Sequence, residues 1–339
     1  MIDALYFHED DRKRLKTDPL VRLLLDPPAG RYDFTIVSAM GVITEGARGR
    51  ELEESYARLE AQRGVRTIRA NTATARSLEY NAARIEDAAR QAKTPWGYIG
   101  YSQGCANGLM AESRLLSGTP EQQKLAERLV ARNLLFSATN GSAHGTCGDW
   151  KTMRAMIEGD RFLKHYQAVA SRQAIRFVID NIKLALDSRL FVHVMGGVAS
   201  LSYEGVRALG RDGQFKATIP TCSIRGVVEP NTLPEALEFL SNALTKQLES
   251  TLHDTQVAAE EAVGHPIQSD NPYASLLERC DMGALVQRTH HWSPLVHETE
   301  FVTTERDRQR CVYDYPKDRH VFPWVDINAR FGLIRRIAP

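Results

Sequence analysis

The chain has 339 residues, of which 43% are hydrophobic and 25% are charged, and its formal net charge is +1. This composition is typical of a globular protein, and the near-neutral charge provides no overall field to attract nucleic acid or an anionic membrane surface. No apolar run approaches the roughly 20 residues of a spanning helix, and no secretory leader is visible, so we expect neither a transmembrane segment nor a nucleic-acid partner.

The cysteines exclude the simplest metal and redox motifs. Five are present, widely spaced and without a CxxC pair: Cys105, Cys147, Cys222, Cys280 and Cys311. Closely spaced pairs are the usual signature of zinc sites and redox dithiols, and paired cysteines are typical of secreted domains. We therefore expect free thiols, a cytoplasmic location and no bound metal.

Strand-like and helix-like segments alternate through the first 140 residues. Short apolar runs that end in small residues predict strands over 34–37, 65–71, 96–102 and 132–139. Helix-forming runs between them predict helices over 50–62, 77–92 and 103–116. Such an alternation with short connections predicts an α/β fold, with a mostly parallel central sheet covered by helices on both faces.

The stretch 149–213 interrupts this alternation, because it is mostly helical in pattern. We interpret it as a helical cap insertion in a core made of 1–148 and 214–339. The core pattern resumes with predicted elements in the second half: a strand over 217–228, a helix over 233–251, a last strand over 311–313 and an amphipathic helix over 324–334.

One short motif carries specific chemistry. Gly100-Tyr101-Ser102-Gln103-Gly104 lies between a predicted buried strand and a predicted helix. That is the context of a nucleophile elbow, in which glycines two residues either side of the serine let the strand and the helix pass closely. The following helix points its first amides toward developing negative charge. Ser102 is therefore the candidate nucleophile.

The motif in this context resembles the α/β-hydrolase superfamily, in particular its esterases and lipases, and GYSQG also resembles the elbow of cutinases. The resemblance implies an oxyanion hole in which the residue after the nucleophile, Gln103, supplies one backbone N–H. The second donor comes from the loop after an earlier strand, here Ser38-Ala39-Met40-Gly41. By position we assign it to Met40, with Ala39 as the neighbouring candidate.

The resemblance also implies that an acid and then a histidine follow the serine. Histidine suits the base because its pKa lies near neutrality. His320 follows the predicted last strand in DYPKDRHVFPW, where the superfamily places its base. The adjacent pair His290 and His291, followed by Trp292, is the main competitor.

Two carboxylates compete for the role of the acid. Asp254 stands in an Asp-x-x-Val arrangement similar to that of esterases and lipases, although Thr255 occupies the place of the usual glycine. Glu229 directly follows the predicted strand 217–228. We prefer Asp254 and keep Glu229 as the alternative acid, whose task in either case is to fix the imidazole tautomer.

The predicted activity is hydrolysis of carboxylic esters through an acyl-enzyme on Ser102, with Asp254 and His320 completing the triad and with no cofactor. The expected substrate is a small-molecule or lipid-like ester; the oligomeric state is left open. The same residues would serve an acyltransferase or a thioesterase. A non-catalytic binding protein of the same fold is the remaining alternative.

Overall fold

The computed structural model describes the central part of the chain most completely. The described residues are 30–41, 50–73, 76–137, 139, 201–216, 219, 221–228, 233, 237–238, 241–242, 245, 252–258, 285–288, 290–294, 305–310, 325 and 335–337. None of the helices within these ranges combines the length and the apolar character that a membrane crossing requires.

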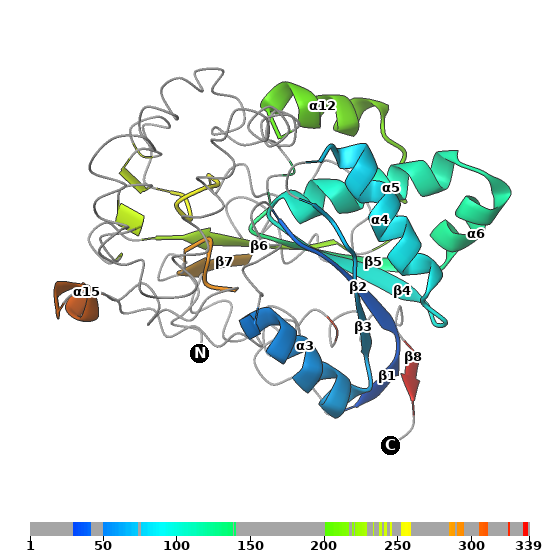
Figure 1. Cartoon of the computed structure of the whole chain (residues 1–339), viewed down its shortest axis with the longest axis horizontal. Helices are drawn as coiled ribbons and strands as arrows, with labels where there is room; N and C mark the ends of the chain where they lie inside the picture. Colours follow the sequence, from blue (N-terminus) through cyan, green and yellow to red (C-terminus); the bar gives the residue numbers. More distant parts are fainter. Residues whose placement is uncertain are drawn as a thin grey trace, which may run out of the picture.

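Six parallel strands form the main sheet in the order β3-β2-β4-β5-β6-β7 (Figure 1). They are β2 (Thr35–Ala39), β3 (Arg66–Arg69), β4 (Trp96–Tyr101), β5 (Leu129–Leu135), β6 (Thr221–Val227) and β7 (Leu285–Arg288). Every neighbouring pair runs parallel. The carboxyl ends of all six strands therefore meet at one edge, which is where open α/β sheets hold their ligands.

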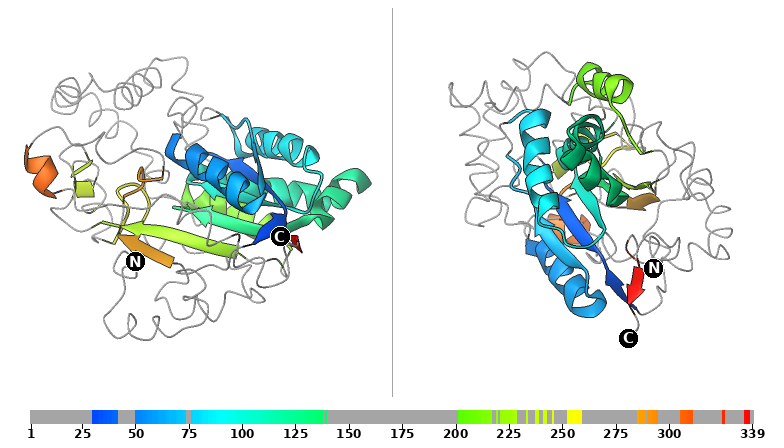
Figure 2. Two further views of the ribbon diagram at one scale, coloured as in Figure 1. Left: turned by 90° about the horizontal axis from the view of Figure 1, so that it is seen from below. Right: turned by 90° about the vertical axis from the view of Figure 1, so that its right-hand side faces the viewer.

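A separate two-stranded sheet pairs β1 (Arg31–Asp33) antiparallel with β8 (Arg335–Ile337), and Figure 2 shows them side by side. Residues from near the two ends of the sequence are thus brought together beside the main sheet. A short helix, α15 (Glu305–Arg310), lies between β7 and β8 in the sequence.

Helices cover both faces of the main sheet (Figure 1). One face carries α4 (Leu78–Arg90), α5 (Gln103–Ser117) and α6 (Pro120–Glu127). The other carries α3 (Arg50–Arg63). Side chains alternate along β2 accordingly: Val37 packs in the core under α4 and α5, whereas Ser38 faces Tyr56 of α3.

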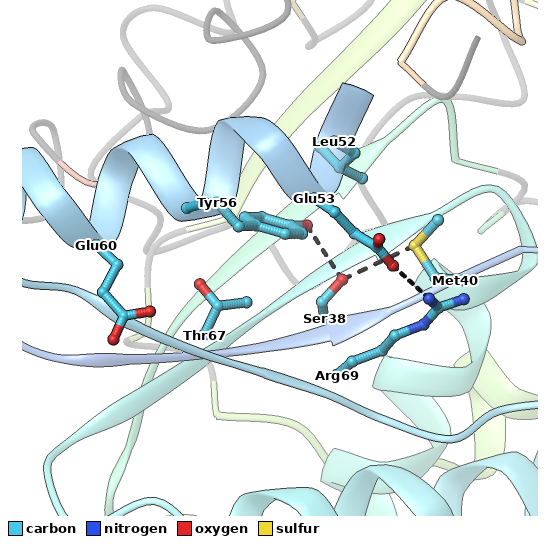
Figure 3. A pocket seen from close by; sticks show the side chains of 9 residues that line it. Ser38, Met40, Leu52, Glu53, Tyr56, Glu60, Thr67 and Arg69 are labelled. Atoms are coloured by element: carbon cyan, nitrogen blue, oxygen red, sulfur yellow. Dashed lines mark hydrogen bonds and ion pairs between the residues drawn. The ribbon is translucent and has the colours of Figure 1, made fainter. Parts of the chain in front are cut away.

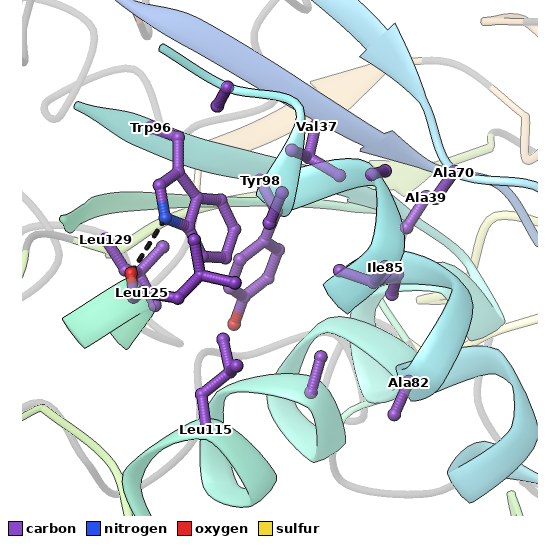
Figure 4. Close-up of a cluster of buried hydrophobic side chains, with 14 of the residues drawn as sticks. Val37, Ala39, Ala70, Ala82, Ile85, Trp96, Tyr98, Leu115, Leu125 and Leu129 are labelled. Atoms are coloured by element: carbon purple, nitrogen blue, oxygen red, sulfur yellow. Dashed lines mark hydrogen bonds between the residues drawn. The ribbon is translucent and has the colours of Figure 1, made fainter. Parts of the chain in front are cut away.

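The largest described apolar core lies between the sheet and α4, α5 and α6 (Figure 4). Two aromatic residues of β4, Trp96 and Tyr98, are fully buried in it, and the indole N–H of Trp96 donates to the backbone carbonyl of Leu125 at 3.0 Å. The small side chains of α4 allow this helix to pack closely: Ala82, Ala88 and Ala89. The core thus fixes the strand and the helix on either side of the GYSQG motif.

The predicted α/β fold class is confirmed. The first-half strands and helices occur where predicted, with ends shifted by up to four residues, and the strand predicted over 217–228 is β6. Five described elements were missed, namely the short strands β1, β7 and β8 and the helices α6 and α15. The strand predicted over 311–313 lies outside the described residues, as does nearly all of the helix predicted over 324–334.

The helical cap over 149–213 stays a prediction, because most of it lies outside the described residues. Its last part is the helix α12 (Tyr203–Asp212), which Ser202 caps by accepting a hydrogen bond from the Gly205 N–H at 3.1 Å. Leu201 and Leu209 pack with Leu109 of α5 and with Val257. This packing brings α12 close to the loop that holds Asp254.

Candidate active site

The turn at Ser102 has the geometry of a nucleophile elbow. Ser102 adopts φ +55° and ψ −123°, a left-handed conformation that costs a non-glycine residue about 1–3 kcal/mol. Its N–H donates to the carbonyl of Leu135 on β5 at 2.9 Å, and its carbonyl accepts from the Cys105 N–H at 3.1 Å. Hydrogen bonds on both sides therefore hold the strained turn, and α5 begins at the next residue.

The two glycines of the motif are required by close packing. A Cβ on Gly100 would lie 2.5 Å from the Cα of Cys105, and a Cβ on Gly104 would lie 2.0 Å from the carbonyl oxygen of Ala39. Side chains cannot occupy such positions without moving the backbone. The glycines let β4, α5 and the end of β2 meet around Ser102, as the motif predicted.

The backbone just after β2 lies directly against Ser102. A Cβ on Gly41 would be 2.6 Å from the Cβ of Ser102 and 3.2 Å from its Oγ. Met40 and Gln103, the two predicted oxyanion donors, are both buried. Their role as amide donors stays a prediction.

A tight loop after β6 presents Asp254. The Val228 N–H donates to the carbonyl of His253 at 3.0 Å, and the Asp254 N–H donates to the carbonyl of Val257 at 3.1 Å. One carboxylate oxygen of Asp254, Oδ1, accepts the N–H groups of Gln256 at 2.9 Å and Val257 at 2.8 Å. The carboxylate is 99% buried, so these donors replace the water that it has lost.

His291 completes the arrangement. Its ring Nδ1 lies 2.8 Å from Oδ2 of Asp254, and both side chains are almost fully buried. The residue sits in the turn 290–294, which follows β7, and its N–H donates to the carbonyl of Asp254 at 2.8 Å. With the Nδ1 proton directed at the carboxylate, Nε2 is left as the ring atom that can accept a proton.

Contacts with aromatic residues bring His291 to the elbow. The hydroxyl of Tyr101, the residue before Ser102, donates to the carbonyl of His291 at 2.6 Å, and the two ring centroids are 5.2 Å apart. Phe136, directly after β5, packs edge-on against the imidazole at 6.1 Å. Phe136 also has a positive φ of +49°, so the backbone is strained directly after both β4 and β5.

The predicted site residues thus have different outcomes. Ser102, Gln103, Met40 and Asp254 lie where β2, β4 and β6 end. Asp254 is paired with His291, the competing histidine, whereas His320 and Glu229 lie outside the described residues. Sequence reasoning gave no role to Tyr101 or Phe136. One feature of the sequence could have favoured His291. The short apolar run Leu285–Val286 belongs to the strand β7, and the histidine pair follows that strand.

A cavity of about 300 Å³ lies beside the loop 38–41, between α3 and the ends of β2 and β3 (Figure 3). Ser38 donates to the hydroxyl of Tyr56 at 3.1 Å, and Arg69 forms an ion pair with Glu53 at the half-exposed rim. Burial raises the pKa of Tyr56, so this phenol stays protonated. Met40 of the loop 38–41 lines this cavity, whereas Ser102 does not.

Within the described ranges, no group of three histidine, cysteine, aspartate or glutamate side chains is placed to hold a metal ion. The carboxylate oxygens of Asp254 accept hydrogen bonds from two backbone amides and lie against one imidazole. The chemistry that the described residues support is proton transfer and nucleophilic attack.

Comparisons with known proteins agree with this architecture. No protein-family model and no curated protein sequence matches the chain significantly. Among solved structures, it is similar to the metagenomic carboxyl esterase MGS0156, with a TM-score of 0.61 at 14% identity over 90% of this chain and 78% of that one.

Two further solved structures align over nearly their whole length. A lipase from Staphylococcus hyicus gives a TM-score of 0.53 at 12% identity, covering 90% of this chain and 98% of the lipase. EstA from Clostridium botulinum gives a TM-score of 0.51 at 12% identity, covering 95% of this chain and 96% of EstA. At such low identity the likeness concerns the fold: the chain has the α/β-hydrolase fold that these esterases and lipases share.

Proposed function

We propose that the protein is a serine hydrolase that cleaves carboxylic esters through an acyl-enzyme on Ser102, with His291 as the base and Asp254 as the acid. The observation that carries this proposal is the 2.8 Å contact between His291 Nδ1 and Asp254 Oδ2 in a turn that Tyr101 ties to the elbow. His291 takes the role that the sequence analysis assigned to His320. The solved esterases and lipases of the same fold support the reaction class.

In the first half of the reaction the Ser102 hydroxyl attacks the acyl carbon of the ester while Nε2 of His291 takes its proton. Asp254 holds the Nδ1 proton and stabilises the imidazolium that forms. The backbone N–H groups of Gln103 and Met40 donate to the oxyanion, and the start of α5 adds its dipole. Collapse of the intermediate breaks the ester C–O bond, and His291 returns the proton to the departing alcohol.

In the second half a water molecule attacks the acyl-enzyme, and His291 takes one proton from it. Collapse of this second intermediate releases the carboxylic acid and regenerates the Ser102 hydroxyl. We propose a small-molecule or lipid-like ester as substrate, with the region 149–213 as the roof of the site. An acceptor alcohol, amine or thiol in place of water would make the same triad an acyltransferase, and a thioester substrate would make it a thioesterase.

The test combines a fluorophosphonate probe with a short p-nitrophenyl ester. The wild-type protein is expected to be labelled and to turn the ester over, whereas Ser102→Ala should do neither and keep its melting temperature. His291→Ala should lose about three decades of turnover or more, and His320→Ala should retain it.

Two outcomes would contradict the assignment. Normal labelling of Ser102→Ala would show that Ser102 is not the nucleophile. An inactive His320→Ala beside an active His291→Ala would show that His320 is the base, as the sequence analysis predicted. Failure of the wild-type protein to react with the probe would favour the non-catalytic binding protein of the same fold.

A further inference from the structure

Tyr101 links the two halves of the proposed site through a single buried hydroxyl. It is the last residue of β4, directly before Ser102, and only 1% of its surface is exposed. Its hydroxyl donates to the carbonyl of His291, a residue 190 positions later, at 2.6 Å. Burial and the negative charge of Asp254 raise the pKa of this phenol well above its ordinary value, so it remains a donor at all working pH values.

The backbone and ring of His291 are held at three points. Its N–H and its Nδ1 both contact Asp254, at 2.8 Å each. These two contacts fix the histidine relative to the acid loop, and would be kept if the loop and the turn moved together. The contact from Tyr101 differs in kind, because it fixes the histidine relative to the strand that carries Ser102.

Ring packing and the hydroxyl have separable tasks. The ring of Tyr101 lies 5.2 Å from that of His291 and 6.3 Å from that of Phe136, so the three rings pack as a cluster. Packing of this kind limits the tilt of the imidazole. The hydrogen bond to the backbone instead limits how far the whole turn can slide relative to the elbow, because hydrogen bonds weaken steeply outside a narrow range of distance and angle.

We propose that Tyr101 is a positioning residue, whose hydroxyl sets the distance between the Ser102 hydroxyl and the imidazole of His291. This inference rests on the proposed function, since it assigns a task within that triad. Proton transfer from serine to histidine needs the two groups within hydrogen-bond reach, and misplacement by about 1 Å can cost about 100-fold in rate. Tyr101 touches neither the substrate nor the transferred proton.

The experiment compares Tyr101→Phe with Tyr98→Phe. Tyr101→Phe keeps the ring and removes only the hydroxyl, so kcat should fall between about 10- and 100-fold with KM unchanged, and fluorophosphonate labelling should slow in parallel. Tyr98 is an equally buried tyrosine of the same strand, but it packs on the opposite face, against Gly108 of α5. Its phenylalanine variant should keep wild-type kcat.

A proton NMR spectrum provides a readout that does not depend on turnover. The proton between His291 Nδ1 and Asp254 Oδ2 should give a far-downfield resonance in the wild-type protein, which disappears in Asp254→Asn. In Tyr101→Phe it should persist at its wild-type position, because both contacts between His291 and Asp254 are kept when the turn moves relative to β4. Loss of this resonance in Tyr101→Phe would contradict the proposal, because the hydroxyl would then support the pair of His291 and Asp254 and not the distance to Ser102.

Three results separate the possible failures. Wild-type kcat in Tyr101→Phe would overturn the positioning role while leaving the hydrolase intact. Equal losses of kcat in both phenylalanine variants would mean that the Tyr101 hydroxyl contributes only to general stability. This result would also overturn the positioning role. A wild-type protein without activity would overturn the proposed function and, with it, the task assigned to Tyr101.

Discussion

Asp254 holds His291 with one carboxylate oxygen and its own loop with the other. Oδ2 meets Nδ1 of His291 at 2.8 Å, while Oδ1 accepts the N–H groups of Gln256 and Val257 at 2.9 and 2.8 Å. The same side chain therefore shapes the loop and orients the imidazole. An asparagine could still shape the loop, because its carbonyl oxygen can accept hydrogen bonds from the two amides. It could not orient the imidazole in the same way.

The first prediction concerns Asp254→Asn. The amide NH₂ would face Nδ1, which favours the tautomer with its proton on Nε2, the atom that must accept the proton of Ser102. Turnover should fall by about three decades or more with a small change in melting temperature. Glu229→Gln, the matched change at the alternative acid, should leave turnover close to that of the wild type; an inactive Glu229→Gln beside an active Asp254→Asn would reverse the assignment.

The elbow could be predicted from sequence because it is a local backbone requirement. Gly100 and Gly104 are needed because β4, α5 and the end of β2 pass within van der Waals distance of one another. The five-residue motif GYSQG contains both glycines, so this requirement is visible in the sequence. The alternation of strands and helices gave the fold class for a similar reason, since each element carries its own apolar pattern.

The partner of Asp254 could not be predicted with the same certainty. β7 has only four residues, and two of them, Gln287 and Arg288, are polar. Its apolar pattern is weaker than that of the segment before His320, so β7 was not predicted and the histidine that follows it was given second place. The contact between Tyr101 and His291 joins residues 190 positions apart, and no local pattern records such a pair.

The second prediction concerns a buried ion pair that supports β5 and α5. Arg132 donates from Nε and Nη2 to the two carboxylate oxygens of Glu112, each at 2.6 Å, and both side chains are 1% exposed. The Lys216 N–H donates to Oε1 of Glu112 at 2.8 Å. Removing one member of such a pair leaves a buried charge uncompensated.

Glu112→Gln should therefore lower the free energy of unfolding by about 3–5 kcal/mol, measured by denaturant titration. Glu305→Gln is the matched control, because its pair with Arg308 is about 70% exposed on both sides. It should change the stability by less than about 0.5 kcal/mol. A Glu112→Gln protein as stable as this control would mean that the buried pair contributes no more than an exposed one.

The third prediction concerns the pH dependence of the stability, to which His253 contributes in the loop 252–258. Nδ1 of this buried histidine accepts the N–H of Thr255 at 3.1 Å, and Nε2 lies 2.8 Å from the hydroxyl of Thr245. The ring is therefore neutral, with its proton on Nε2 and directed at Thr245. Burial lowers the pKa of His253 below its ordinary value of 6.5, and the nearby charge of Asp254 opposes this only in part.

A lowered pKa in the folded state means that the unfolded chain binds the proton more readily. The contribution of His253 to stability is thus fully present above about pH 6.5 and is lost as the pH falls toward the lowered pKa. The melting temperature should drop more steeply over this window in the wild type than in His253→Gln, which cannot be protonated. Parallel curves for the two proteins would show that His253 does not titrate as its surroundings require.

The fourth prediction concerns Thr255, which follows the acid at the place where the resemblance led us to expect glycine. It has φ +90°, a conformation that suits glycine and is strained for a β-branched residue. Its side chain is fully buried, and its Oγ1 has no hydrogen-bond partner among the described residues. The strain costs about 1–3 kcal/mol, and the unpaired hydroxyl costs about as much again.

Thr255→Gly removes both costs and keeps the N–H that donates to His253. The added freedom of glycine in the unfolded chain opposes this gain by about 0.5–1 kcal/mol, so the variant should be more stable by about 1 kcal/mol or more. Thr255→Ala removes only the hydroxyl and keeps the strained Cβ, so its melting temperature should lie between those of the wild type and Thr255→Gly. Turnover should stay unchanged in both, because Asp254 keeps its three hydrogen bonds. A melting temperature below that of the wild type in Thr255→Gly would mean that packing of the threonine side chain outweighs the strain of the turn.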